Sequence, residues 1–97
     1  MDFKINDFEG PLDLLLHLIK ESKMDIMNIE IEKITNQYMD FLHQTEKMNL
    51  EISSEYLVLA SELLEIKSKM LLPRNEDALE EEEDPREELM NRLIEYQ

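Results

Sequence analysis

The chain has 97 residues, a formal net charge of -14 at pH 7 and no cysteine. Its length allows one small domain with an added segment, and its excess of acids disfavours direct nucleic-acid binding, because phosphate contacts need clustered Lys and Arg. The first residues lack the basic region of a signal peptide, and no apolar run is long enough to cross a membrane, so we expect a soluble intracellular protein.

The first helix is predicted at residues 11–22, directly after the single glycine of the chain. Pro11 stands at the first helical position, where the missing N–H removes no hydrogen bond. Apolar residues then follow at helical spacing: Leu12, Leu15, Leu16 and Ile19. Three apolar residues that alternate with polar ones before this helix predict a short extended segment docked on the core: Phe3, Ile5 and Phe8.

A second helix is predicted at residues 31–46, after an apolar connector. Its apolar face is formed by residues at helical spacing: Ile31, Ile34, Tyr38, Phe41 and Leu42. A third helix continues to Leu72 and is ended by Pro73. Asn49 and Ser53 are both candidate N-caps for this helix, because their side-chain oxygens can accept a hydrogen bond from its first turn.

The third helix carries two apolar rows, where a surface helix of a monomer usually carries one. The first row is spaced like a coiled-coil seam: Ile52, Tyr56, Leu59, Leu63, Ile66 and Met70. The second row is interrupted only by Lys67: Leu57, Ala60, Leu64 and Leu71. Two interpretations follow. The helix is either the centre of a tight three-helix bundle, or one row and the C-terminal half stay open for a partner helix, since the two shorter helices are too short to cover both rows.

The C-terminal part is strongly acidic, with 10 acidic and 2 basic residues in the range 75–97. The stretch 74–84 has almost nothing to bury, which predicts a flexible, solvated linker rather than a binding site. Asp84, Pro85 and Glu87 then have the spacing of a helix start with a capping box. Apolar residues follow at helical spacing: Leu89, Met90, Leu93 and Ile94.

These patterns predict an all-α fold in three parts. A three-helix domain with a long third helix occupies residues 1–73, the acidic linker occupies residues 74–84, and a fourth helix begins a further helical region at residues 85–97.

Patterns for catalysis and metal binding are missing. A single glycine cannot build a phosphate-binding loop, and the acidic run lacks the spacing of an EF-hand loop. His17 with Glu21, and His43 with Glu46, have the spacing of a two-donor metal clip, but two donors do not make a site. We expect a protein that is not an enzyme and holds no cofactor or metal.

Four stretches carry a resemblance to a known family: FEGPLDLLL at 8–16, DIMNI at 25–29, IKSKMLLP at 66–73 and EEDPREEL at 82–89. Together and in this order they resemble segregation and condensation protein A, the ScpA family of bacterial kleisins. The resemblance covers essentially the whole chain. It implies a non-catalytic adaptor that joins the SMC ATPase and the ScpB dimer in the bacterial condensin, which organises and segregates chromosomes.

The resemblance also implies what each part of the chain binds. The N-terminal domain would bind the coiled-coil neck of SMC, and the region after it would begin the ScpB-binding part. DNA would be reached only through SMC, with no small-molecule ligand and no membrane, in the cytoplasm at the nucleoid. For the SMC neck we expect these residues of the third helix: Tyr56, Leu57, Ala60, Leu63, Leu64, Lys67, Met70 and Leu71. For ScpB we expect Leu89, Met90, Leu93 and Ile94. The alternative is a self-associating helical module that forms a homodimer through the third helix.

Overall fold

The computed structural model describes residues 3–72 and 84–97. The described part contains a short 3-10 turn, four α-helices and no strand, so the predicted all-α fold class is confirmed. The elements are η1 (Ile5–Asp7), α1 (Pro11–Glu21), α2 (Ile31–Lys47), α3 (Ser54–Leu71) and α4 (Glu87–Tyr96). The predicted linker at 74–84 lies outside the described residues except for Asp84.

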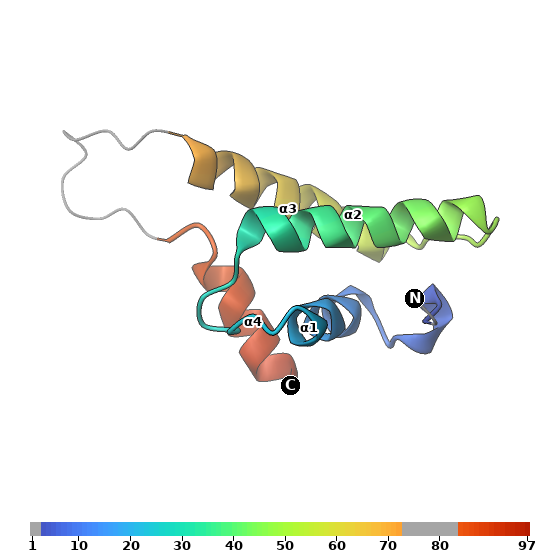
Figure 1. The fold of residues 1–97 in the computed structure, drawn as a ribbon, viewed down its shortest axis with the longest axis horizontal. Helices are drawn as coiled ribbons and strands as arrows, with labels where there is room; N and C mark the ends of the chain where they lie inside the picture. Colours follow the sequence, from blue (N-terminus) through green and yellow to red (C-terminus); the bar gives the residue numbers. More distant parts are fainter. Residues whose placement is uncertain (1–2, 73–83) are drawn as a thin grey trace.

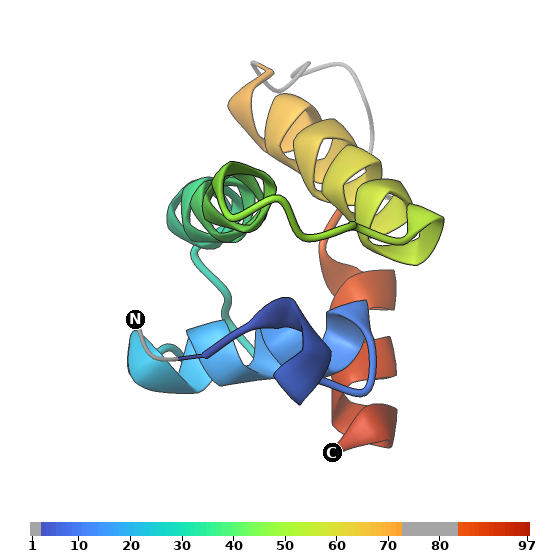
Figure 2. The ribbon, with the colours of Figure 1, turned by 90° about the vertical axis from the view of Figure 1, so that its right-hand side faces the viewer.

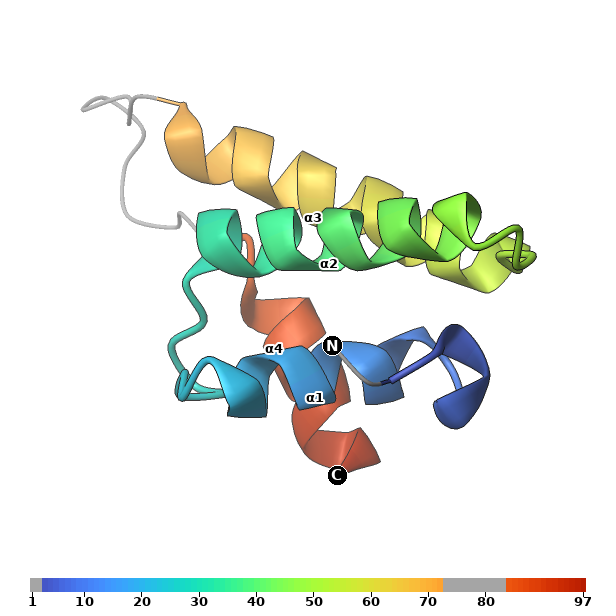
Figure 3. The same cartoon turned by 45° about the vertical axis from the view of Figure 1, so that its right-hand side comes forward.

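The helices form two layers. Helices α2 and α3 lie side by side and run in opposite directions along the length of the molecule (Figure 1). Helices α1 and α4 lie beneath them and cross each other (Figure 2). Because α1 touches α2, α3 and α4, it is covered on most of its circumference. The last turns of α3 extend past the start of α2 (Figures 1 and 3).

One hydrophobic core joins all four helices. Each helix contributes residues at helical spacing, and full burial of a Leu- or Ile-sized side chain stabilises the fold by about 1.5–3 kcal/mol. The central members, almost inaccessible to solvent, are Leu14, Leu15, Ile19, Ile34, Tyr38, Leu63, Leu89 and Leu93. The sequence assigned the fourth helix to a separate region after the linker, whereas its apolar face belongs to this same core.

Helices α1 and α2 both end in a Schellman motif, in which a residue with positive φ turns the chain away. After α1 the residue is Lys23, with φ 57°, and the N–H of Met24 donates to the carbonyl of Ile19 at 3.1 Å. After α2 the residue is Asn49, with φ 58°. Asn49 therefore caps the end of α2 and not the start of α3, and Ser53 holds the N-cap position of α3.

Two other predicted segments have a different conformation. The residues before α1 form the turn η1 rather than an extended segment, because the Asp7 carboxylate accepts a hydrogen bond from the backbone N–H of Lys4 at 2.8 Å. Ile5 is buried, so the predicted docking of this segment on the core is correct. Helix α4 begins at Glu87 and not at Pro85, since Asp84 uses its carboxylate to close a turn on the backbone N–H of Arg86 at 2.9 Å.

Candidate functional site

Most of the exposed large apolar residues of the described helices lie on α3. Leu57, Leu64 and Leu71 are 53%, 47% and 64% exposed, and we call these three residues the outer row. They are spaced by seven residues, so they lie on one face over roughly 21 Å of helix. Met70 and Leu72 extend the exposed apolar surface at the C-terminal end of α3.

The other residues predicted for the SMC contact lie differently. Tyr56, Ala60 and Leu63 are buried in the core, at most 7% exposed, so they do not belong to an outward face. Lys67 is half-buried beside the outer row. The outer row is therefore formed by the three leucines of the second apolar row, with a gap at Ala60, which is buried in the core.

Small polar residues separate the leucines of the outer row. Ser61 and Ser68 are both exposed and lie on the solvent side of the row. The Ser61 hydroxyl donates to the carbonyl of Val58 at 2.7 Å, so its donor is satisfied within the helix. A second helix that passes over this face would therefore meet small side chains at these two positions, and Lys67 at the opposite border of the row.

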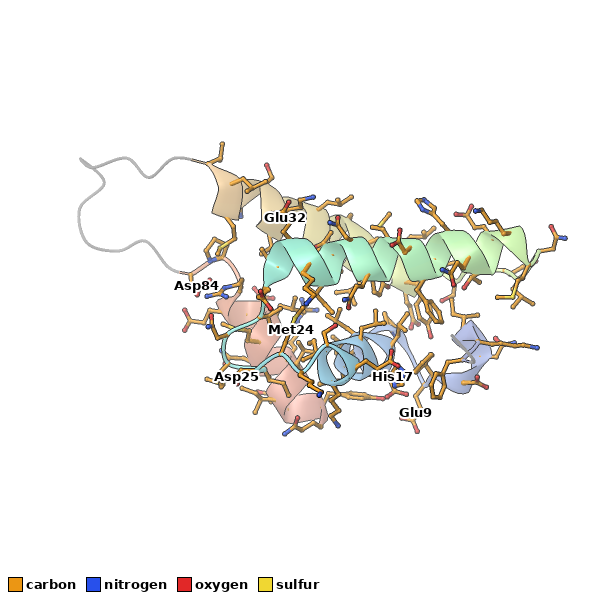
Figure 4. The ribbon with its side chains drawn as sticks, in the orientation of Figure 1. Glu9, His17, Met24, Asp25, Glu32 and Asp84 are labelled. Carbon is orange, nitrogen blue, oxygen red and sulfur yellow. The ribbon has the colours of Figure 1, made fainter. Side chains whose placement is uncertain are left out.

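A cleft of about 570 Å³ lies where the start of α2 meets the end of α3. Met70 and Leu71 give it an apolar wall, and Lys67 and Arg86 also line it. The acidic residues Glu30 and Glu32 line it as well; Glu32 lies on the first turn of α2 (Figure 4). The C-terminal end of the outer row thus has an apolar hollow beside it, bordered by charges of both signs.

The residues predicted for the ScpB contact are mostly buried. Leu89 and Leu93 are 1% and 0% exposed, Met90 is also in the core, and only Ile94 reaches the surface at 39%. Figure 2 shows α4 against the start of α1. In this arrangement the buried residues of α4 pack in the hydrophobic core of the same chain.

The two predicted pairs of metal donors, His17 with Glu21 and His43 with Glu46, gain no third donor among the described residues. His17 Nε2 lies 3.3 Å from Glu21 Oε1, and its ring packs against Phe3 with the ring centres 4.3 Å apart. In the part of the chain that the structure describes, no group of three or more His, Cys, Asp and Glu side chains is placed to hold a metal ion. None of the described helices is long and apolar enough to cross a membrane.

Comparison with known proteins identifies the family. The family described as segregation and condensation protein ScpA matches residues 18–97. The chain belongs to the ScpA family. The segregation and condensation protein A of Ligilactobacillus salivarius is 54% identical over 99 residues, which cover 100% of this chain and 38% of that protein. The protein of the same name from Bacillus cytotoxicus is 52% identical over 101 residues, which cover 99% of this chain and 41% of the relative. A Clostridium botulinum relative, also of that name, is 60% identical over 63 residues, covering 62% of this chain and 25% of the relative.

The resemblance read from the sequence motifs is thereby confirmed. This ScpA chain spans about two fifths of the length of the Ligilactobacillus and Bacillus relatives.

The polar contacts that hold α4 were not predicted from the sequence. The Arg86 guanidinium donates to the carbonyl of Ile29 at 2.6 Å, Arg92 forms an ion pair with Glu62 of α3, and the Tyr96 hydroxyl donates to Glu9 at 3.0 Å. One signal was available: these two arginines are the only basic residues of the acidic range 75–97. A cation in so acidic a stretch indicates a specific partner.

Proposed function

We propose that this chain is a non-catalytic ScpA-type adaptor that binds the coiled-coil neck of an SMC ATPase through the outer row of α3 and takes part in chromosome segregation and condensation. Membership of the ScpA family supports the chromosomal role. Contact with DNA is made through SMC, because the charge of -14 opposes direct phosphate binding. The proposal places the protein in the cytoplasm at the nucleoid.

The observation that carries the proposed SMC contact is the exposure of Leu57, Leu64 and Leu71 on one face of α3. These leucines are about half exposed, so a partner that covers one of them fully gains about half of the roughly 1.5–3 kcal/mol that burial of a fully exposed leucine provides. Spacing by seven residues matches the repeat of a coiled coil, so this face can join a two-stranded coil as an additional helix of a small bundle. Lys67 is half-buried beside the row, and in this proposal its charge meets an acidic group of the partner helix.

The test uses Leu64→Glu and Leu71→Glu in a pull-down with a purified SMC head-and-neck fragment. Each change puts a charge on the outer row, and we expect a loss of binding of at least about tenfold while circular dichroism stays helical. Val58→Glu is the matched control: Val58 is an equally exposed residue of α3, but it lines a cleft with Tyr96 on another side of the helix. Full binding by both leucine variants would refute the choice of face.

The proposal includes a second partner. The apolar residues of α4, which are Leu89, Met90, Leu93 and Ile94, begin the region that binds ScpB. The support is the amphipathic pattern of α4 within a chain of the ScpA family.

Self-association through α3 is a second candidate function, favoured by the same exposed row. A homodimer would bury Leu64 and Leu71 of one copy against those of another, so its mass would rise with concentration. Sedimentation equilibrium distinguishes the candidates: a mass that stays monomeric across the micromolar range excludes the homodimer, and a dimer that Leu64→Glu dissociates supports it.

A further inference from the structure

Helix α4 has one apolar face, and the core of its own chain covers that face at Leu89, Met90 and Leu93 but not at Ile94. The helix has ten residues, from Glu87 to Tyr96, and an amphipathic helix of this length has only one apolar stripe. Leu89 and Leu93 are 1% and 0% exposed in the core. A side chain with no accessible surface cannot touch a second protein without leaving its present place.

Polar contacts hold α4 at its start, middle and end. At the start, Arg86 donates to the side chain of Asn28 at 3.1 Å and to the carbonyl of Ile29 at 2.6 Å. Figure 4 shows Asp84 at this point, where the chain enters α4. The guanidinium of Arg86 also binds the carboxylate of Asp84 at 2.7 Å, which keeps it aimed at the loop before α2.

The other two contacts lie further along α4. In the middle, Arg92 pairs with Glu62 of α3, and both side chains are about one-third exposed. At the end, the hydroxyl of Tyr96 donates to Glu9, just before α1. Solvent-exposed polar contacts of this kind are individually weak. An apolar centre with a solvent-accessible polar rim is the usual anatomy of a protein interface.

We infer that α4 alternates between two partners, the core of its own chain and the ScpB-type protein, so that the ScpB-type protein binds only molecules whose α4 has left the core. This inference rests on the proposed function, in which Leu89, Met90 and Leu93 contact ScpB. The two states use the same side chains and therefore exclude each other. The apparent affinity for the partner is reduced by the fraction of molecules in which α4 is undocked.

A reversible lock on α4 tests this directly. The chain contains no cysteine, so Glu62→Cys with Arg92→Cys creates one pair of thiols at the contact between α3 and α4, which a short bis-maleimide links. In the full natural protein, with any further cysteines replaced by serine, we expect the linked form to bind purified ScpB at least about tenfold more weakly than the same protein before linking.

The matched control links a different pair of elements. Ser22 at the end of α1 donates to Gln37 of α2 at 2.8 Å, so Ser22→Cys with Gln37→Cys takes the same linker and leaves α4 free to move. Linked control protein is expected to bind ScpB like unlinked protein. Equal binding by the linked and unlinked forms of the Glu62 and Arg92 pair overturns the inference and leaves the proposed partner intact. Absence of ScpB binding in every form, including the unaltered protein, overturns the proposed partner and the inference together.

A charge swap tests the opposite direction. Glu62→Arg sets two cations against each other at the contact between α3 and α4 without altering any residue of α4. We expect ScpB to bind about threefold to tenfold more tightly, with faster hydrogen exchange in α4, because the undocked fraction rises. Adding Arg92→Glu restores the attraction and is expected to reverse both changes. Weaker binding by Glu62→Arg together with faster exchange in α4 contradicts the inference.

Discussion

The phenol hydroxyl of Tyr38 donates a hydrogen bond of 2.8 Å to the backbone carbonyl of Tyr56. Tyr38 is 0% exposed, so this bond lies inside the core, where the middle of α2 meets the first turn of α3. It fixes how far α3 is shifted along α2. The direction of the outer row depends on this packing, because Tyr56 is buried in the core while its neighbour Leu57 is exposed to solvent.

Tyr38→Phe keeps the ring in the core and removes only the hydroxyl. We expect a loss of about 1 kcal/mol in the free energy of unfolding, since the Tyr56 carbonyl loses a buried donor. Urea denaturation followed by circular dichroism measures the change. Tyr96→Phe is the control, because its hydroxyl bonds to Glu9 at an exposed position and its loss is expected to be smaller. Equal losses in the free energy of unfolding would show that the buried hydrogen bond of Tyr38 contributes no more stability than the exposed one of Tyr96.

Stability is expected to fall in alkaline solution. Burial raises the pKa of Tyr38, and it also raises the pKa of Tyr56, with Asp13 and Glu55 contributing further. The unfolded phenol ionises near its ordinary pKa of about 10. The contribution of Tyr38 is therefore fully present below about pH 10 and is lost as the pH rises above that value. Urea titrations between about pH 8 and 11 are expected to show this decline and to show less of it in Tyr38→Phe. A stability that rises over this range contradicts the assignment.

Local spacing was sufficient to predict the main helices. The expected ranges 11–22 and 31–46 differ by one residue from the observed α1 and α2, because apolar periodicity and Pro11 act within a few residues. Asn49 and Asp84 were harder to place, since each can satisfy either a helix start or a turn through its side chain. The positive φ of Asn49 shows that this residue ends α2. The hydrogen bond that the Asp84 carboxylate accepts from the N–H of Arg86 shows that Asp84 closes a turn before α4.

Whether an apolar helix face packs into the core or stays exposed depends on tertiary contacts, which the spacing of apolar residues does not determine. The sequence shows two rows on α3 but does not determine which one the core covers. The spacing assigns Ala60 to the open side, although it is buried in the core. Leu89 and Leu93 fit a core and a partner equally well. The contact that orients α4 joins Arg86 to Ile29, 57 residues away in the chain. The SMC and ScpB contacts themselves remain predictions.

Lys23 is a site where a substitution is expected to stabilise the fold. A lysine with φ 57° pays a steric cost that glycine avoids. Lys23→Gly is expected to gain about 0.5–1 kcal/mol, after allowing for the greater freedom of glycine in the unfolded chain. Asn49→Gly is the comparison, with a smaller expected gain, because asparagine tolerates this conformation well. Thermal unfolding of both variants provides the measurement, and destabilisation by Lys23→Gly would contradict the expectation.

Leu93 and Ile94 are adjacent in α4 but differ in burial, which makes them a matched pair for the docking of this helix. Leu93 is 0% exposed and Ile94 is 39% exposed. Leu93→Ala is expected to cost about 2–4 kcal/mol in the free energy of unfolding, because it leaves a cavity in the shared core. Ile94→Ala is expected to cost less than about 1 kcal/mol, since its side chain already touches water. Urea denaturation of the 97-residue chain measures both. Similar small costs at the two positions would mean that α4 spends most of its time away from the core in solution.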